Sequence, residues 1–397
     1  MWRVPDAERA FYRLRPKKSL GGCICGRDLA DSVGVGTPPS AVAAVVMASL
    51  LSKAKSAVGS AMGYTSALTA PTRSFKGNGT DFERFVGFLA ASIFSIIYVA
   101  APLYLFAALL SVPFYGLTSW TTIKLWLPLV ASMLLPDSIH HVLSPLILCS
   151  WPFRQIPKYF EFEEFHEMAD EELKKSGKNY IFAVHPHGVF SYVGVCGAIT
   201  SMNAPDGIGP KLSSKVPTAA ASVLKKFPLL KDVLGVFGVI PADAKTLAKQ
   251  LKANSLVLYV GGMAELFKTS PKRDAVYLKG RKGFIKIALR SGADVLPCYF
   301  FGNTTVLEAM TYGPLADLSR KLGVSMTLFW GRFFLPMPKR VPLTYARGRP
   351  LGLPHIPEPT EAEIDHWHAV YCERVKELFE RYKGFNPDYK HKELLVE

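Results

Sequence analysis

The feature that most constrains this chain is a long uncharged apolar stretch between Phe85 and Ile123. Its first part, residues 86–110, reads VGFLAASIFSIIYVAAPLYLFAALL. A helix rises about 1.5 Å per residue, so about 20 apolar residues are enough to cross the hydrocarbon core of a bilayer. Pro102 is expected to kink such a helix without excluding it, because kinks are tolerated in membrane helices. The stretch therefore predicts a membrane-spanning helix.

A second apolar segment, LTSWTTIKLWLPLVASMLLP (117–136), follows a break at 113–116. It is interrupted by Lys124 and Pro128, so both a second span and a re-entrant limb stay open. We predict an N-terminal membrane-embedded helical hairpin over residues 84–150. Two crossings would leave the tail before it and the domain after it on one face, the cytosolic one.

The charge of the chain is strongly basic, at +15 in total. A basic excess suits anionic membranes, nucleic acids or phosphate-bearing ligands, and does not choose among them. No nucleic-acid motif accompanies it, so we expect no nucleic-acid partner. Residues 1–83 are basic and rich in small residues, which predicts a largely disordered tail. The six cysteines form no CxxC pair, which is typical of a reduced, cytosol-facing protein.

Residues 151–397 have the pattern of a cytosol-facing α/β domain. Apolar strand patterns alternate with amphipathic helix patterns, which favours a mostly parallel sheet flanked by helices. The expected strands are 179–184, 255–260 and 294–302, and the expected helices are 244–254 and 281–292. Thr360 and Glu363 have the spacing of a capping box at the start of a last amphipathic helix.

The sequence HPHG (185–188) directly follows the first of these strands. Gly261 and Gly302 likewise follow the next two, and ligands of parallel sheets gather at the carboxyl ends of strands. We therefore expect these positions to form one site. Pro186 is expected to rigidify the motif, and Gly188 to let the backbone approach a ligand closely.

Three chemistries and one structural role suit the two histidines. A metal could use both if the segment stays extended, since residues two apart then face the same way, but no third ligand cluster stands out, so we expect no metal. A serine hydrolase needs a GxSxG elbow, which is absent from the sequence. General-base catalysis needs only one positioned imidazole. From HPHG alone, a hydrogen-bonded turn is an equally good interpretation.

Two further segments, GGMAE (261–265) and RKGFIKIALRSGADVLPCYFFG (281–302), follow HPHG in order. Together the three motifs resemble the diacylglycerol acyltransferase type 2 family, which includes monoacylglycerol and wax-alcohol acyltransferases. The resemblance runs from about Arg84 to Gly384 and implies a glycerolipid-acyltransferase-like fold. Two positions depart from the family pattern: Glu161 follows Tyr159–Phe160 where the family often has proline, and Asn303 replaces glutamate after Phe301–Gly302.

The resemblance implies transfer of a fatty acyl group from acyl-CoA to the hydroxyl of diacylglycerol at the endoplasmic reticulum membrane, and also at lipid droplets. Acyl-CoA is then a co-substrate, and no cofactor is expected. The partners would be a neutral-lipid acceptor and the bilayer, and self-association into a homo-oligomer stays open.

The same resemblance suggests roles for individual residues. His187 or His185 would be the general base, with His187 favoured because Gly188 adjoins it. Distantly related glycerophospholipid acyltransferases pair their histidine with a nearby aspartate, but Phe190 and Tyr192 stand five positions after the two histidines. Glu265 is therefore the expected acidic partner. Backbone N–H groups near Gly188 or Gly261–Gly262 are candidates for an oxyanion site.

The phosphates of acyl-CoA would need cations near the site. The candidates come from the start of the third motif and its end: Arg281, Lys282, Gly283, Phe284 and Gly302. The rival interpretations are a monoacylglycerol or wax-alcohol acyltransferase, which share the motifs, and a non-catalytic membrane or lipid-droplet scaffold.

Overall fold

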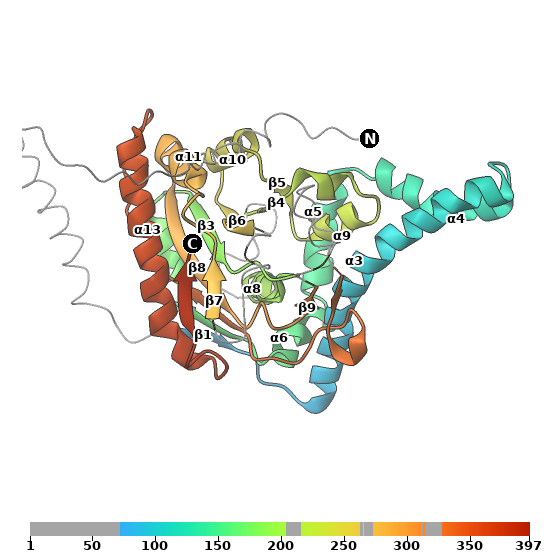
Figure 1. Cartoon of the computed structure of the whole chain (residues 1–397), viewed down its shortest axis with the longest axis horizontal. Helices are drawn as coiled ribbons and strands as arrows, with labels where there is room; N and C mark the ends of the chain where they lie inside the picture. The colour runs from blue at the N-terminus through green and yellow to red at the C-terminus, as the bar shows by residue number, and fades with distance from the viewer. Residues whose placement is uncertain (1–71, 204–215, 263–264, 266–272, 311–312, 314–327) are drawn as a thin grey trace, which may run out of the picture. The chain divides into compact units, whose positions relative to one another are not determined.

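A mixed sheet with helices on both faces forms the centre of the computed structural model, which describes residues 72–203, 216–262, 265, 273–310, 313 and 328–397 (Figure 1). The strands are β1 Thr72–Lys76, β2 Glu163–His166, β3 Tyr180–His185, β4 Thr218–Ala220, β5 Ile240–Pro241, β6 Leu256–Tyr259, β7 Arg273–Val276, β8 Asp294–Phe301, β9 Glu308–Ala309, β10 Phe329–Trp330, β11 Thr344–Arg347 and β12 Glu393–Val396. The α-helices are α3 Asp81–Tyr115, α4 Trp120–Leu134, α5 Asp137–Leu148, α6 Ile156–Tyr159, α7 Asp170–Lys175, α8 Tyr192–Asn203, α9 Leu230–Val236, α10 Ala244–Leu251, α11 Gly283–Ser291 and α13 Glu361–Tyr382.

Within the described residues the main sheet has the order β1-β2-β11-β8-β3-β6-β4-β5. Strands β8, β3, β6, β4 and β5 are parallel to one another. Strand β11 is antiparallel to β8 and parallel to β2, and β1 closes the edge antiparallel to β2. The α/β prediction is confirmed, and the parallel half of the sheet brings the ends of β8, β3 and β6 to one edge.

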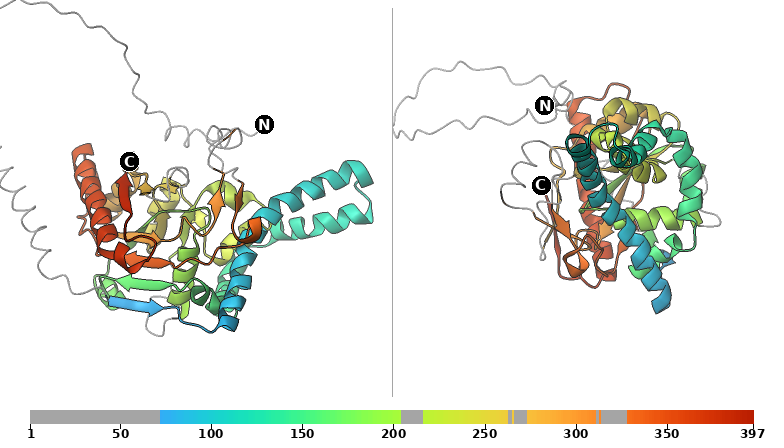
Figure 2. Two further views of the ribbon diagram at one scale, coloured as in Figure 1. Left: turned by 60° about the horizontal axis from the view of Figure 1, so that its bottom comes forward. Right: turned by 90° about the vertical axis from the view of Figure 1, so that its right-hand side faces the viewer.

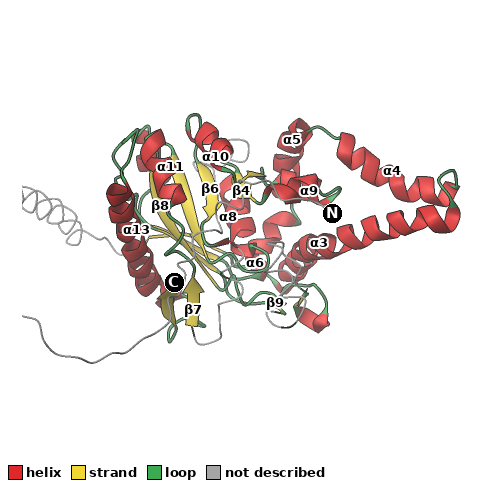
Figure 3. Ribbon diagram, turned by 45° about the horizontal axis from the view of Figure 1, so that its top comes forward, coloured by secondary structure: helices red, strands yellow, loops and turns green. Residues whose placement is uncertain are grey.

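Side-chain alternation along β3 divides the core into two layers. Ile181 and Ala183 pack in the layer covered by α10, α11 and α13. Phe182 and Val184 pack in the layer covered by α8 and α6 (Figure 3). Because successive strand residues point to opposite faces, the sequence YIFAVH supplies apolar side chains to both layers, and every residue of β3 is buried.

The predicted capped helix is confirmed as α13. The Thr360 side chain accepts the N–H of Glu363, and the Glu363 carboxylate accepts the N–H of Thr360. The predicted helix end at Gly292 is also confirmed, since this residue closes α11 with a left-handed backbone at φ 69°. These two caps fix the helices that cover one face of β3.

Helix α3 is long and apolar enough to cross a bilayer, and it alone among single helices of the described part of the chain meets that criterion. Helices α4 and α5 meet it only as a pair, and they are bent by 97° at their junction. The Trp126 indole donates to Ala108 O, so α4 packs on α3 beyond the turn at Gly116 (Figure 2). Embedding of this helix pair in a membrane stays a prediction.

The described residues belong to one compact unit. Most of the tail predicted over residues 1–83 lies outside the described residues, but residues 72–83 contain β1 and the start of α3. The division at 83/84 and 150/151 stays a prediction.

Candidate active site

His185 is the last residue of β3 and is completely buried. Its Nδ1–H donates to Oε1 of Glu265 at 2.6 Å, and its Nε2 accepts from the hydroxyl of Tyr371 on α13 at 2.6 Å. Burial raises the pKa of Tyr371 well above its ordinary value, so the phenol remains a donor. Both nitrogens of His185 are therefore occupied inside the core, which suits a residue that positions its neighbours.

The backbone of the HPHG turn is held by two buried polar side chains. Oε2 of Glu265 accepts the N–H of His187 at 2.9 Å, so the same carboxylate contacts both histidines. The Asn303 side chain donates to Pro186 O at 3.1 Å and His187 O at 2.7 Å. Its own oxygen accepts the N–H of Val193. Asn303 is 1% exposed, so these bonds are made away from water.

Two glycines permit this close packing. Gly188 has φ +67°, and a Cβ there would lie 2.8 Å from Asn303 O. A Cβ on Gly261 would collide with the carboxylate of Glu265. The predicted glycines of HPHG and GGMAE thus make room for the groups that hold the histidine turn, and Gly262, at φ +57°, turns the chain toward Glu265.

The side chain of His187 lies in a different environment from that of His185. Its Nδ1–H donates to Gly188 O at 2.8 Å, and its ring contacts Tyr259 edge-on with centroids 4.7 Å apart. Within the described residues Nε2 has no hydrogen-bond partner, and His187 lines a cavity. In this tautomer Nε2 carries the lone pair, as a general base requires.

The two histidines do not face the same way, as a metal site that used both would require. Strand β3 ends at His185, so the alternation of an extended chain does not continue to His187. His185 lies in the layer of α11 and α13 with Tyr371, whereas His187 lies against Tyr259 on the cavity side. Within the described residues there is no group of three or more His, Cys, Asp or Glu side chains that could hold a metal ion.

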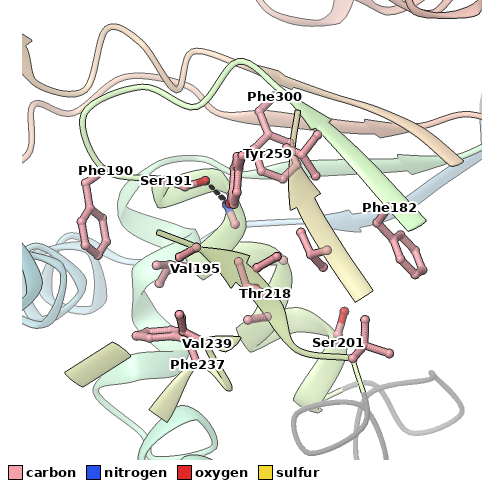
Figure 4. A pocket seen from close by; sticks show the side chains of 18 of the residues that line it. Phe182, Phe190, Ser191, Val195, Ser201, Thr218, Phe237, Val239, Tyr259 and Phe300 are labelled. Carbon is pink, nitrogen blue, oxygen red and sulfur yellow. Dashed lines mark hydrogen bonds between the residues drawn. The ribbon is translucent and has the colours of Figure 1, made fainter. Parts of the chain in front are cut away.

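The cavity beside His187 has a volume of about 260 Å³ and lies under α8, between this helix and the sheet (Figure 4). Small residues of α8 line it at helical spacing: Gly194, Gly197, Ala198 and Ser201. Residues three and four apart share a helix face, so this face leaves a space where larger side chains would fill the core. The rest of its lining is mainly apolar and includes Phe182, Val195, Val239 and Phe300.

The residues predicted to bind acyl-CoA lie elsewhere. Lys282 pairs with Asp365 on α13 at 2.6 Å, and the Arg281 guanidinium lies over the Tyr277 ring. Phe284 is 5% exposed and packs edge-on against Tyr371. Gly283 begins α11, and Gly302 directly follows β8. These five residues do not line the cavity, and their role in binding acyl-CoA stays a prediction.

Sequence analysis missed Tyr371, Tyr259 and Ser191, and treated Asn303 only as a departure from a motif. Tyr371 lies on the apolar face of α13, 186 residues after His185, and helical periodicity identifies it only as a core residue. Asn303 could have been found, because it is a polar residue two positions after a buried strand, at the edge where the other motifs end.

Comparison with known proteins gives an independent result. A family model described as diacylglycerol acyltransferase matches residues 150–396. Diacylglycerol O-acyltransferase 2 of Dictyostelium discoideum is 35% identical over 52% of this chain and 67% of its own length. The human protein of that name is 31% identical over 52% of this chain and 57% of its own. Human 2-acylglycerol O-acyltransferase 3 is 30% identical over 52% of this chain and 65% of its own length.

Among solved structures, the 1-acyl-sn-glycerophosphate acyltransferase PlsC of Thermotoga maritima overlaps 75% of this chain and 97% of its own. The TM-score of 0.34 and 12% identity are too low for this likeness to carry an argument.

The relatives are acyltransferases, and this is the class of enzyme to which the matched region belongs. The family model covers more than half of the chain, so the chain belongs to the diacylglycerol acyltransferase family. The chain spans between 57% and 67% of the lengths of these curated relatives.

Proposed function

We propose that this protein transfers a fatty acyl group from acyl-CoA to the free hydroxyl of diacylglycerol, with His187 as the general base. One observation carries the proposal: His187 lies at the wall of an apolar cavity, with Nδ1 bonded to Gly188 O. Family membership supplies the reaction class, and the relatives' names supply the acceptor.

In this mechanism Nε2 of His187 takes the proton of the acceptor hydroxyl as its oxygen attacks the thioester carbonyl carbon. The C–S bond then breaks, and the CoA thiolate leaves and receives the proton from the imidazolium. A thiol of pKa about 8.5 is a good leaving group, so no covalent acyl-enzyme is needed. A positioned general base of this kind contributes about 10²–10⁴-fold in rate.

His185, Glu265 and Tyr371 act as positioning residues in this account. They form one buried chain of hydrogen bonds, from the phenol through the imidazole to the carboxylate and on to the N–H of His187. The chain fixes the backbone of His187 and therefore the direction of its ring. A misplacement of about 1 Å at a reacting group can cost about 100-fold in rate.

The acyl chain of the thioester would lie in the cavity under α8. Its lining is mainly apolar, which suits a hydrocarbon chain, and His187 and the small-residue face of α8 border the same space. We further propose that the backbone N–H groups near Gly188 or Gly261–Gly262 contribute to stabilising the developing oxyanion.

The protein would act while anchored in a membrane, at the endoplasmic reticulum and at lipid droplets, with its sheet domain in the cytosol. Beyond its contacts with the sheet domain α3 exposes large apolar side chains, with Leu103 63%, Phe106 59% and Phe114 77% exposed. Contiguous exposed apolar surface of this kind is typical of membrane contact. An enzyme held there receives a water-insoluble acceptor laterally.

The test uses the full chain purified in detergent and reconstituted in liposomes. It is incubated with labelled oleoyl-CoA and, in separate reactions, diacylglycerol, monoacylglycerol and a long-chain alcohol. Labelled triacylglycerol supports the proposal, and an ester of another acceptor keeps the mechanism but changes the substrate. Failure of well-folded protein to form any ester refutes the proposal and favours a non-catalytic scaffold.

A further inference from the structure

A pair of hydroxyl groups lies beside His187 in the wall of the cavity. The Tyr259 hydroxyl donates to Oγ of Ser191 at 2.6 Å, and Figure 4 shows these two side chains next to each other. The Tyr259 ring also contacts the His187 ring. Both residues line the cavity. Tyr259 ends β6, and Ser191 directly precedes α8 and lies four residues after His187, so two segments, residues 187–191 and the end of β6, meet here.

Ser191 has an ordinary structural role as the residue that caps α8. Its Oγ accepts the N–H of Gly194 at 3.3 Å, and its backbone oxygen accepts the N–H of Val195. A capping serine stabilises a helix by about 1 kcal/mol, which would be enough to explain its presence. The Tyr259 hydroxyl, which donates to the same serine oxygen, is not part of such a cap and needs another explanation.

The hydrogen-bond count on Ser191 leaves one donor unused. A serine hydroxyl has two acceptor lone pairs and one proton, and Gly194 and Tyr259 supply donors for both lone pairs. Within the described residues the Ser191 hydroxyl donates to no acceptor. Burial raises the pKa of Tyr259 to about 12, so the phenol stays protonated and keeps its role as donor.

Close packing supports the pair. A Cβ on Gly194 would lie 2.5 Å from the Tyr259 oxygen and 2.9 Å from Oγ of Ser191, so the absence of a side chain in the first turn of α8 admits the phenol. Two donors on one hydroxyl also polarise it, which makes its own proton a better donor.

We propose that the Ser191 hydroxyl, oriented by Tyr259, donates a hydrogen bond to the thioester carbonyl oxygen as negative charge develops on it. This rests on the proposed acyl transfer and adds a catalytic residue to it. When the acceptor oxygen attacks the carbonyl carbon, the π electrons move to the carbonyl oxygen, and Ser191 stabilises that charge without giving up its proton. The charge returns to re-form C=O as the C–S bond breaks.

The test separates donation from helix capping by comparing Ser191→Ala, Ser191→Thr and Ser191→Asp. The alanine variant loses cap and donor, threonine keeps both, and aspartate keeps the cap but has no O–H. Loss of one oxyanion donor costs about 10²–10³-fold in kcat. We expect that loss in the alanine and aspartate variants, with at least a tenfold recovery over alanine in the threonine variant. The KM for acyl-CoA should change little.

Tyr259→Phe removes only the orienting hydroxyl and should lower kcat by about tenfold, because the Ser191 proton loses its fixed direction. The matched control is Ser291→Ala, which removes a hydroxyl that donates to Ile287 O and Ala288 O on α11 and does not line the cavity. It should keep kcat within about twofold of the parent.

A Ser191→Asp variant that is folded and retains kcat within about threefold of the parent overturns the inference, as does an equal loss of kcat in Ser291→Ala. If the parent protein forms no ester, the proposed acyl transfer itself is refuted. This outcome is distinguishable from a refutation of the role of Ser191, which requires an active parent.

Discussion

Gly197 on α8 offers the sharpest test of where the acyl chain lies. It belongs to the small-residue face that lines the cavity, and a Cβ there would lie 3.7 Å from the Tyr345 ring, an ordinary contact distance. Gly197→Leu should therefore fold, since leucine also favours the helix over glycine by about 0.5–1 kcal/mol. The new side chain adds four carbon atoms to the cavity.

The size of the effect follows from the space that leucine takes. If it removes room for about four methylenes at about 0.8 kcal/mol each, long acyl chains lose about 3 kcal/mol of binding relative to chains four carbons shorter. That corresponds to roughly a 100- to 200-fold change in relative kcat/KM, as an upper value, because neighbouring side chains can relax.

The assay measures kcat/KM for a series of acyl-CoA thioesters from eight to eighteen carbons. Gly384→Leu is the control, since Gly384 is exposed and a Cβ there meets open space. A folded Gly197→Leu enzyme with the same chain-length profile as the parent would refute the placement of the acyl chain under α8.

Three other changes have defined outcomes. Asn303→Ala leaves two carbonyls and one N–H near the histidine turn without their hydrogen-bond partner. The free energy of unfolding should fall by about 2–4 kcal/mol, the Tm in a thermal melt should fall by roughly 5–10 °C, and kcat should be reduced. Tyr371→Phe removes the donor to His185 and should lower stability to urea by about 1–3 kcal/mol while lowering kcat less than loss of His187 does; an unchanged urea midpoint would contradict the buried hydrogen bond. Hydrogen bonds with Thr360 lower the folded-state pKa of Glu363 below its ordinary value of 4.5, so its contribution to stability is present above 4.5 and is lost as the pH falls through the lowered folded value. Glu363→Gln should therefore lower the Tm at about pH 7, and the Tm difference between parent and variant should shrink at about pH 3. An equal Tm difference at both pH values would exclude the charge of Glu363 as the cause.

Much of the sheet domain follows from local sequence patterns. The apolar run at β3, the amphipathic α11 closed by Gly292, and the capping box of α13 each depend on residues that are close in sequence. Parallel strands that end in HPHG and GGMAE are expected to bring these motifs to one edge, and Glu265 does bind the His185 ring.

The rest depended on contacts that sequence spacing does not encode. The opposite directions of His185 and His187 result from the end of β3 at His185, which apolar periodicity does not locate. The phenol of Tyr371 and the amide of Asn303 reach the turn from distant segments through the register of the sheet and the packing of α13. The cavity exists because the glycines and small residues of α8 face the sheet, and helical periodicity alone treats such residues as neutral.

The most direct test of the central claim compares His187→Ala, His187→Gln and His185→Ala at matched folded protein in the liposome assay with oleoyl-CoA and diacylglycerol. If His187 is the base, both of its variants should retain the thermal stability of the parent and lose about 10²–10⁴-fold in kcat. His185→Ala should instead melt at a lower temperature, because it leaves the buried Glu265 and Tyr371 without their shared partner. A stable His187 variant with near-parental kcat would contradict the account.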